Sequence, residues 1–257
     1  MISKELINKV NKSEEEFTTL FSKRYPSNVV ERYFDDELKD MYDHNFSLVK
    51  EEINDEILNA LLRIKEERKE TFIKIECSKK LNSLVEKGFD EEQEITLVKE
   101  DYKNFNIPSI DFVTYKRYSE NKEIIKDVIR IEQEYYGESY GVDFCERRWI
   151  RYANRVDQND HSGLDIWVIY DNAIAIGYCY SFFNNEVVAM DGLLVIKEYR
   201  NKYVASNLIK HIAAYYDSPI YLHADEDDTP KEIYYKLGFI KCNVTFEYFI
   251  EKGHYEF

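Results

Sequence analysis

The chain has 257 residues, which at about 150 residues per domain allows one large domain or two small ones. Hydrophobic residues make up 44% of it, and it has only 8 glycines and 4 prolines, which excludes a disordered, low-complexity or collagen-like chain. The net charge of −15 is spread evenly over both halves and repels phosphate backbones and anionic lipid headgroups. We therefore expect no nucleic-acid partner and no membrane partner, and a mild attraction for an amine.

The longest apolar stretch, around residues 173–183, is too short and too polar to span a bilayer, and the N-terminus shows no uninterrupted apolar region of a signal peptide. We expect a cytoplasmic protein on this basis. The four cysteines lie far apart, with no Cys-x-x-Cys pair and no histidine at zinc-ligand spacing, so we interpret them as reduced core thiols: Cys77, Cys145, Cys179 and Cys242.

Hydrophobic periodicity predicts alternating helices and strands in the first half of the chain. The predicted elements are a helix within the first thirty residues, a strand around 42–49, a helix over 54–70, a strand over 71–77, a short helix capped by Ser78 and ending at Gly88, and a strand over 95–99. Residues 104–108 are the best candidate for a boundary. We therefore predict a smaller N-terminal α/β unit over 1–107 and a second domain over 108–257.

The pattern restarts after this boundary. The predicted elements are a strand over 109–116, helices over 121–136 and 145–155, three strands within 164–196, a helix over 203–216, a strand over 219–223, a helix over 230–237, and one or two strands over 239–251. Asp171-Asn172 and Asn184-Asn185 separate the three strands as two-residue hairpin turns, because Asn and Asp tolerate positive φ.

The two halves share an order of elements: strand, helix, strand, short helix, Gly-Phe, strand. Gly88-Phe89 and Gly238-Phe239 stand at matching places in this order. The repeat favours two related units. A chance similarity stays open, because Gly-Phe after a helix is also simply a C-cap followed by a core residue.

The most informative segments are 193–208, LLVIKEYRNKYVASNL, and 223–239, HADEDDTPKEIYYKLGF. Val195 ends a strand, Arg200 to Ala205 form a loop before a long helix, and Tyr234 to Phe239 give the pattern Tyr-x-x-x-Gly-Phe. In these features residues 109–257 resemble the GNAT superfamily of acyl-CoA-dependent N-acetyltransferases. The resemblance implies an α/β fold with a mixed sheet flanked by helices, and the N-terminal unit would be a degenerate copy of it.

The loop also suggests an anion site on physical grounds. A strand that turns tightly into a helix leaves backbone N–H groups unpaired at the positive end of the helix dipole, where phosphate binds. The resemblance implies acetyl-CoA as co-substrate, with its pyrophosphate on this loop. The cofactor-binding residues that it implies are Leu194, Val195, Arg200, Lys202, Tyr203, Val204, Ala205 and Ser206.

Tyr203 departs from the family pattern, because the family usually has its first loop glycine there. We expect Tyr203 to take a negative φ and point outward, which leaves its amide available; otherwise the domain is a relic of the fold that does not bind CoA. In the first half, Lys50, Glu51, Glu52 and Ile53 stand where the loop would be, so we expect that half not to bind CoA.

The resemblance also implies catalytic roles. Tyr234 would protonate the departing thiolate, and Asp191 or Glu186 would be the base, both expected on the strand before the loop, with Asp191 nearer its splayed end. Packing alone is the alternative for Tyr234, and solvation is the alternative for both carboxylates. We expect no metal site, because His223 and the acidic run 225–228 are better explained as a solvated loop.

The function implied is acetyl transfer from acetyl-CoA to a primary amine of a small molecule or peptide. The alternative is a non-catalytic protein that binds CoA or a partner with a degenerate GNAT fold. The acceptor pocket is expected around residues 135–155, where aromatic side chains either line it or pack in the core: Tyr135, Tyr136, Tyr140, Phe144 and Trp149. The identity of the amine and the oligomeric state stay open.

Overall fold

The structure is a computed structural model that describes residues 2–50, 52–158, 163–227 and 231–251. The chain forms two compact units that interleave along the sequence. Unit 1 holds residues 1–16, 97–223 and 229–242, and unit 2 holds residues 17–96, 224–228 and 243–257. The division of the sequence at residue 107 stays a prediction. Within the described ranges, no helix is both long enough and apolar enough to cross a membrane.

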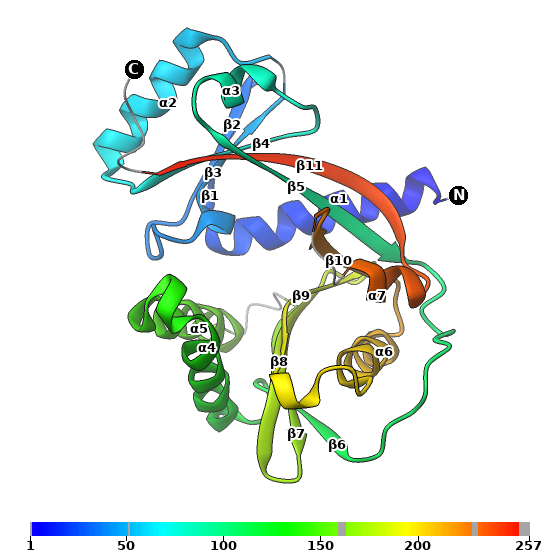
Figure 1. The fold of residues 1–257 in the computed structure, drawn as a ribbon. Coiled ribbons are helices and arrows are strands. Elements are labelled where there is room, and N and C mark those ends of the chain that lie inside the picture. Colours follow the sequence, from blue (N-terminus) through cyan, green and yellow to red (C-terminus); the bar gives the residue numbers. More distant parts are fainter. Residues whose placement is uncertain (1, 51, 159–162, 228–230, 252–257) are drawn as a thin grey trace. The chain divides into compact units, whose positions relative to one another are not determined.

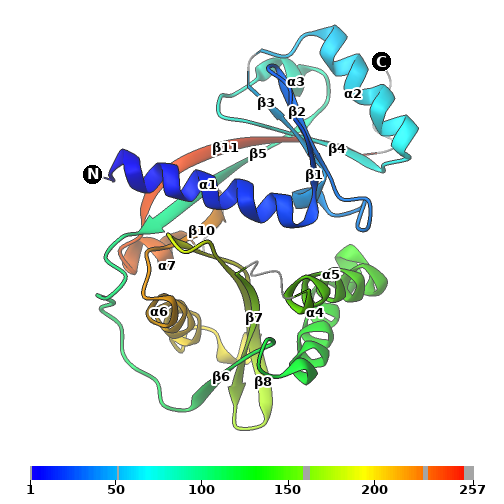
Figure 2. The same cartoon turned by 180° about the vertical axis from the view of Figure 1, so that it is seen from behind.

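Unit 1 is built on a mixed sheet in the order β10-β9-β8-β7-β6. Its strands are antiparallel except for the parallel pair β9–β10. The elements are β6 (Val113–Arg117), α4 (Ile125–Tyr140), α5 (Val142–Asp157), β7 (Leu164–Asp171), β8 (Ile174–Phe183), β9 (Val188–Val195), α6 (Val204–Tyr216), β10 (Ile220–Asp225) and α7 (Lys231–Lys236). Helices α4 and α5 lie on one face of β7, β8 and β9, and α6 lies on the other (Figures 1 and 2). The predicted α/β class, with a mixed sheet flanked by helices, is confirmed.

The two predicted hairpins of unit 1 are present, but each turn lies one residue later than predicted. Asp171 is the last residue of β7 and pairs with Ile174, and the Asn184 amide donates to the Val187 carbonyl, so the turns fall at 172–173 and 185–186. Asn172 and Asn185 have φ of 53° and 70°, the left-handed values that these turns require. The predicted helix over 121–136 begins with a short 3-10 turn, Lys122–Ile124, because the side chain of Asn121 accepts a hydrogen bond from the Glu123 amide. Pro230, at the start of the predicted helix over 230–237, lies outside the described residues.

Unit 2 has the strand order β1-β2-β3-β4-β11-β5. Its elements are β1 (Lys23–Tyr25), β2 (Val30–Phe34), β3 (Phe46–Val49), α2 (Asp55–Arg68), β4 (Phe72–Cys77), α3 (Asn82–Glu86), β5 (Asp90–Lys99) and β11 (Ile240–Glu251). The helix α1 (Lys4–Phe21) begins in unit 1 and ends in unit 2, and β5 and β11 also contribute residues to both units. The core gathers around β4, with Leu58, Leu61, Ile75, Leu84 and Tyr248.

The two halves of the chain share the order of elements that the repeat predicts: β3-α2-β4-α3 in the first and β9-α6-β10-α7 in the second. Both strand pairs, β3–β4 and β9–β10, are parallel. Gly88 and Gly238 have φ of 84° and 86°. The amides of the following residues, Phe89 and Phe239, donate to the carbonyls of Leu84 and Tyr234 at 3.1 and 3.0 Å. The buried Leu84 is therefore the counterpart of Tyr234, without its hydroxyl.

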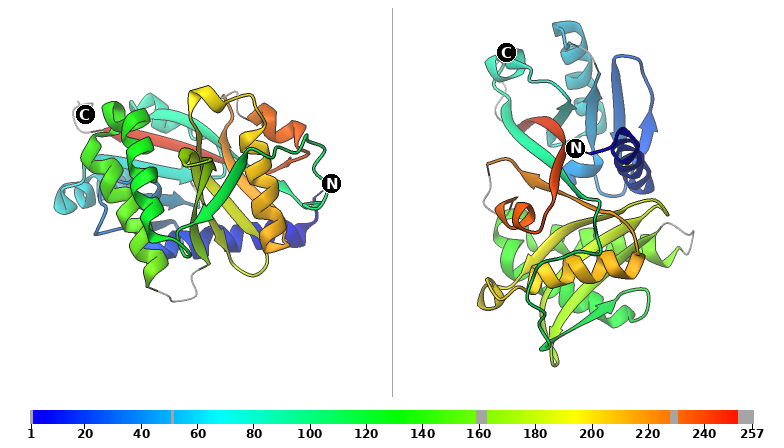
Figure 3. Two further views of the ribbon diagram at one scale, coloured as in Figure 1. Left: turned by 90° about the horizontal axis from the view of Figure 1, so that it is seen from below. Right: turned by 90° about the vertical axis from the view of Figure 1, so that its right-hand side faces the viewer.

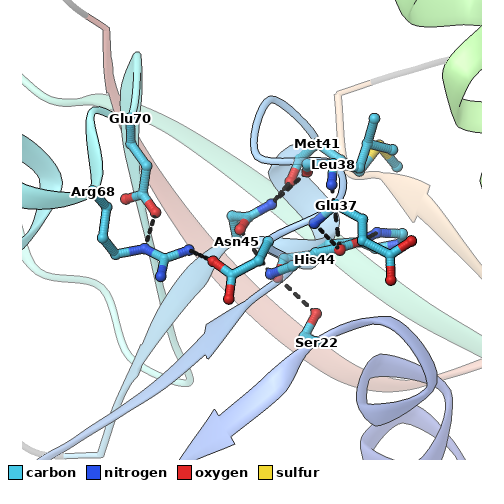
Figure 4. Close-up of polar contacts among 10 residues, drawn as sticks. Ser22, Glu37, Leu38, Met41, His44, Asn45, Arg68 and Glu70 are labelled. Carbon is cyan, nitrogen blue, oxygen red and sulfur yellow. Dashed lines mark hydrogen bonds and ion pairs between the residues drawn. The ribbon is translucent and has the colours of Figure 1, made fainter.

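A buried polar network closes the loop between β2 and β3 in unit 2 (Figure 4). His44 Nδ1 lies 3.0 Å from Asp35 Oδ2, and both side chains are almost fully buried. The Asn45 side chain donates to the carbonyls of Leu38 and Met41 at 2.9 Å, and Ser22 Oγ donates to the His44 carbonyl at 2.7 Å. These bonds satisfy backbone groups that would otherwise be buried without partners, so this histidine is explained by structure alone.

A second buried cluster in unit 2 surrounds Lys74, which is 4% exposed. Lys74 Nζ lies 2.8 Å from Glu247, 3.0 Å from Glu76 and 3.5 Å from Asp43. Burial alone would lower the pKa of Lys74, but these carboxylates raise it well above its usual value. Burial and the neighbouring carboxylates Glu76 and Glu94 raise the pKa of Glu247 to about 8, although Lys74 acts in the opposite direction. One lysine thus faces an excess of carboxylates, which favours the protonated form of Glu247.

This proton makes the stability of the protein depend on pH. The pKa of Glu247 in the folded state, about 8, lies above its unfolded value of roughly 4.3, so the folded state binds the extra proton between these two values. Stability therefore falls as pH rises through this window, by at most about 1.4 kcal/mol per pH unit. We expect Glu247→Gln to remove this decline. The free energy of unfolding of the unmodified protein should therefore fall relative to that of Glu247→Gln as the pH rises from 5 to 8. Urea unfolding at fixed pH values measures it.

Glu86→Gln, at an exposed position of α3, is the matched control, and its stability should run parallel to that of the unmodified protein. A Glu247→Gln difference that stayed constant from pH 5 to 8 would show that Glu247 ionises normally in the folded protein.

Candidate active site

The parallel strands β9 and β10 pair over a short distance only. Val188 is opposite Ile220 and Ala189 is opposite Tyr221, and in the described part of the chain these are the only paired residues of the two strands. β9 nevertheless continues to Val195. Among the residues that the structure describes, one edge of β9 therefore has no strand partner from Met190 onward.

β9 carries a bulge where this edge becomes open. Tyr178 is opposite Leu194 but Tyr180 is opposite Asp191, so β9 has one more residue than β8 at this point. The bulge includes Gly192, whose φ of 62° is a left-handed backbone value. The Asp191 carboxylate is fixed there, because Oδ2 accepts a hydrogen bond from the Tyr180 hydroxyl at 2.7 Å and Oδ1 accepts one from the Gly192 amide at 2.6 Å.

Replacing Gly192 tests whether the bulge needs a glycine. A Cβ atom there would lie 3.1 Å from the Tyr180 ring and 3.5 Å from Arg148 Nη2, on a backbone that L residues rarely adopt. We expect Gly192→Ala to lower the free energy of unfolding by about 1–2 kcal/mol for the left-handed backbone, and further for the contact with Tyr180. Urea unfolding measures the loss.

Gly88→Ala is the matched control for this substitution. Its φ is 84°, and a Cβ atom there would have nothing within 4 Å, so it reports the backbone cost alone. Equal losses for the two variants would contradict a packed bulge around Gly192.

The loop after β9 leads directly into α6. It contains a 3-10 turn, Lys197–Tyr199, and two residues with left-handed backbone, Asn201 and Tyr203, at φ of 61° and 60°. Helix α6 has no side-chain cap and no acidic residue in its first turn. Among the described residues, the amides of Val204, Ala205 and Ser206 have no hydrogen-bond acceptor. They point out of a helix N-terminus, which makes this end of α6 a site for an anion.

Tyr203 differs from the expectation for its backbone. The predicted negative φ is wrong, since Tyr203 has φ of 60° and ψ of 13°, values that a glycine adopts readily. Its side chain points outward, as expected, and is 51% exposed. Asn207 holds this conformation, because its Nδ2 donates to the carbonyls of Tyr203 and Pro108 at 2.9 and 3.0 Å. The loop thus keeps the backbone course that a glycine would give it.

The other residues predicted to bind the cofactor lie around this loop. Leu194 and Val195 are buried at the end of β9. Arg200 Nε donates to the Val195 carbonyl at 2.9 Å, and its guanidinium lies 5.7 Å from the centre of the Tyr135 ring. Lys202 is exposed and lies over the Tyr199 ring. Arg200 thus fixes the loop to the end of β9. Lys202 places its ammonium group at the surface of the loop, on a long aliphatic side chain.

The corresponding helix of the first half, α2, has a different N-terminus. The Asn54 side chain caps it by accepting a hydrogen bond from the Ile57 amide at 2.9 Å, and Asp55 and Glu56 occupy its first turn. Glu52 is exposed just before it, and Glu51 lies outside the described residues. A phosphate there would meet a filled cap and carboxylates, and the expectation that this half does not bind CoA stays a prediction.

The three predicted catalytic residues lie on three different parts of unit 1. Tyr234 lies half-buried on α7, with its ring 6.0 Å from that of Phe239. Glu186 lies in the turn before β9, not on the strand as predicted, and pairs with Lys12 at 3.0 Å. Five residues of extended chain, about 17 Å, separate it from Asp191. Asp191 therefore lies at the bulge, whereas Glu186 lies before the opposite end of β9 and away from the bulge.

Two groups on the sheet around Asp191 were not assigned to the site from the sequence. His223 Nε2 lies 2.9 Å from Glu14 Oε1, which comes from α1. Since Ala189 is opposite Tyr221, the residues two positions further, Asp191 and His223, belong to the same face of the sheet. The second group is Glu132, Arg148 and Tyr178. His223 was visible only beside an acidic run, of which Asp228 lies outside the described residues; within those ranges no group of His, Cys, Asp and Glu could hold a metal ion.

The predicted aromatic residues of α4 and α5 divide between core and surface. Trp149 is fully buried against Tyr152 and Tyr178. The Tyr135 hydroxyl accepts a hydrogen bond from the Lys197 amide at 2.7 Å and so helps to fix the loop. Tyr136 and Tyr140 stack with ring centres 5.5 Å apart and are 38% and 53% exposed.

Comparisons with known proteins agree with this arrangement. Residues 125–239 match the model of the acetyltransferase (GNAT) family. A functionally unknown conserved protein from Staphylococcus epidermidis has a similar structure, with 15% identity over 90% of this chain and 94% of that chain and a TM-score of 0.75. A GCN5-related N-acetyltransferase from Kribbella flavida is also similar, with 13% identity over 96% of each chain and a TM-score of 0.65.

The likeness in fold extends over both halves of the chain. A tandem GNAT protein from the clavulanic acid biosynthesis pathway shares 11% identity over 96% of this chain and 97% of that chain, with a TM-score of 0.53. No curated protein matches the sequence. The family match and the loop at the start of α6 fall on the same part of the molecule, and residues 125–239 of this chain are a domain of the GNAT acetyltransferase family.

Proposed function

We propose that this domain transfers an acetyl group from acetyl-CoA to a primary amine. The observation that carries the proposal is the N-terminus of α6, which follows the loop after β9. The amides of Val204, Ala205 and Ser206 have no acceptor there among the described residues. Anions bind at such an end because the N–H groups and the helix dipole act together. The open edge of β9 leads from this end toward Asp191.

The chemistry assigned to the side chains is direct attack on the thioester. Asp191 takes a proton from the substrate ammonium and later releases it to solvent. The amine nitrogen attacks the carbonyl carbon, the C–N bond forms and the C–S bond breaks. Tyr234 gives its phenolic proton to the departing thiolate, and the phenolate recovers a proton from the new amide nitrogen. The products are the N-acetylated amine, free CoA and one proton.

Release of free thiol from acetyl-CoA, followed with a thiol-reactive chromophore over a panel of primary amines, tests the transfer. We expect at least one amine to raise the rate above hydrolysis. Binding is measured separately by thermal unfolding, because a ligand at 100 times its dissociation constant stabilises the folded state by about 2.7 kcal/mol.

A non-catalytic role for the same fold is favoured by one observation, the tyrosine at position 203 in place of a glycine. The two measurements separate the possibilities. Binding without thiol release would indicate a CoA-binding protein, whereas no stabilisation at millimolar acetyl-CoA would contradict every CoA-dependent role.

A further inference from the structure

The guanidinium of Arg148 lies on the α4–α5 face of the sheet, beside the bulge in β9. Its Nη1 donates to Glu132 Oε1 at 3.0 Å, and the other oxygen of Glu132 accepts a hydrogen bond from the Tyr178 hydroxyl. Glu132 is only 1% exposed, and the side chain of Arg148 is 16% exposed. The arginine is therefore held in one orientation by a carboxylate that is itself held.

This arginine has donors that the protein does not use. Its Nε is buried and has no hydrogen-bond partner, and among the described residues Nη2 has none either. The Nε–H and one N–H of Nη2 lie on the same edge of the guanidinium plane. A carboxylate fits such an edge with two parallel hydrogen bonds, and a buried donor without a partner costs about 1–3 kcal/mol. The unused edge is thus shaped for an anion that the free protein lacks.

The free edge lies close to Gly192, the residue that follows the predicted base. Nη2 is 3.5 Å from the position that a Cβ atom on Gly192 would take, and Gly192 directly follows Asp191. Neighbouring Cα atoms are about 3.8 Å apart. A molecule that placed one carboxylate on Arg148 and its amine at Asp191 would therefore have the two groups separated by only a few bonds.

The charge of Arg148 is local and permanent. Burial alone would lower the pKa of Arg148, but the carboxylate of Glu132 more than offsets this and raises the pKa above its usual value. The guanidinium is therefore charged at every relevant pH. The chain as a whole carries −15 and does not attract anions in general. Recognition of a carboxylate at this point would thus depend on contact with Arg148.

We infer that the acceptor is an amino acid, whose carboxylate binds Arg148 while its α-amine is presented to Asp191. The inference rests on the proposed acetyl transfer and names the substrate class of the same site. It also explains why a glycine stands at position 192, since a side chain there would approach both the Tyr180 ring and Nη2.

Matched pairs of acceptors test the inference: L-phenylalanine against phenethylamine, L-leucine against isoamylamine, and L-lysine against cadaverine. Each pair differs only in the α-carboxylate. We expect kcat/KM for thiol release to be about 100-fold higher for the preferred amino acid than for its decarboxylated partner, since a charge-assisted bidentate contact is worth about two factors of ten. Equal or better use of the decarboxylated amines would overturn the inference.

Arg148→Lys keeps the charge beside Glu132 but removes the planar fork. We expect it to raise KM for the amino acid about 10- to 100-fold, with a smaller change in kcat and little change for the decarboxylated amine. Arg147→Lys is the control, because the Arg147 side chain is 41% exposed and pairs with Asp143 at 2.7 Å. The double variant Arg148→Met, Glu132→Gln removes both charges without leaving one buried alone, and it should lose the preference altogether. A preference that survived unchanged in Arg148→Lys and in the double variant would contradict the role of Arg148.

If no amine causes release of thiol from acetyl-CoA, the proposed transfer is refuted. Binding of an amino acid at Arg148 can still be tested in that case. Thermal unfolding with each amino acid alone then gives the answer. We expect an amino acid, but not its decarboxylated amine, to raise Tm for the unmodified protein and for Arg147→Lys, and not for Arg148→Lys. The absence of any such rise, with no thiol release, would overturn the inference together with the function.

Discussion

Ala205→Asp should abolish binding of acetyl-CoA without unfolding the protein. Ala205 is the second residue of α6, where a carboxylate is favoured by the helix dipole by about 0.3–1 kcal/mol and can accept the free amides of the first turn. The same carboxylate would occupy and repel the place of the pyrophosphate. The expected result is an unchanged or higher Tm without ligand, and no rise in Tm with millimolar acetyl-CoA.

Ala205→Asn is the matched control, because it has nearly the same shape and carries no charge. We expect it to weaken acetyl-CoA binding far less than Ala205→Asp. Acetyl-CoA binding to Ala205→Asp with the affinity of the unmodified protein would place the pyrophosphate elsewhere and refute the assignment of the α6 N-terminus.

Asp191→Asn should lower kcat/KM for acetyl transfer by about 10²–10⁴-fold while leaving acetyl-CoA binding unchanged. Asparagine keeps an oxygen that can accept the hydrogen bond from the Tyr180 hydroxyl, now 2.7 Å from Asp191, so the bulge should be retained. What is lost is the ability to take a proton from the ammonium. Steady-state thiol release over a range of pH measures the effect, and thermal unfolding with acetyl-CoA checks binding.

Two further variants show whether this effect belongs to Asp191. Glu186→Gln should leave the rate unchanged, since Glu186 lies in the turn before β9 and pairs with Lys12. His223→Asn tests the neighbouring histidine, which lies 2.9 Å from Glu14 and belongs to the same face of the sheet as Asp191. A large loss for His223→Asn with almost none for Asp191→Asn would transfer the role of base to the histidine.

The elements of unit 1 could be predicted well because their sequence pattern is strong. β7, β8 and β9 are nearly continuous apolar runs, and Asn172 and Asn185 have the positive φ that their hairpins require. β2 was missed because Glu31 interrupts its apolar pattern. This glutamate is 1% exposed and interacts with Arg24 and Lys50; burial raises its pKa, but these partners bring it to about 2. A strand stabilised by a buried charge has no hydrophobic signature.

Helix starts depend on contacts that lie far away in the sequence. Ser78 was predicted to cap α3, but the helix begins at Asn82, after Leu81. The Leu81 amide donates to the Tyr248 hydroxyl at 2.7 Å, a partner 167 residues away. Tyr203 is a similar case. Asn207, whose side chain also donates to the Pro108 carbonyl 99 residues away, donates to the Tyr203 carbonyl and holds a left-handed backbone that tyrosine seldom adopts on its own.

The candidate site could be predicted only where it lies in one segment. The loop from Arg200 to Ser206 is contiguous, so its position at the start of α6 followed from the order of strand and helix. Arg148 and Glu132 come from two different helices, and His223 and Glu14 are 209 residues apart. Contacts between residues so far apart in the chain follow no fixed sequence spacing, so a single sequence does not predict them.

Calorimetric titration of the protein with acetyl-CoA tests the central claim most directly. The uncapped N-terminus of α6 predicts one site per chain, and the Asn54 cap and acidic first turn of α2 predict that the first half adds none. The expected stoichiometry is therefore one acetyl-CoA per chain, and it should fall to zero in Ala205→Asp. No binding to the unmodified protein, or two sites per chain, would contradict this account.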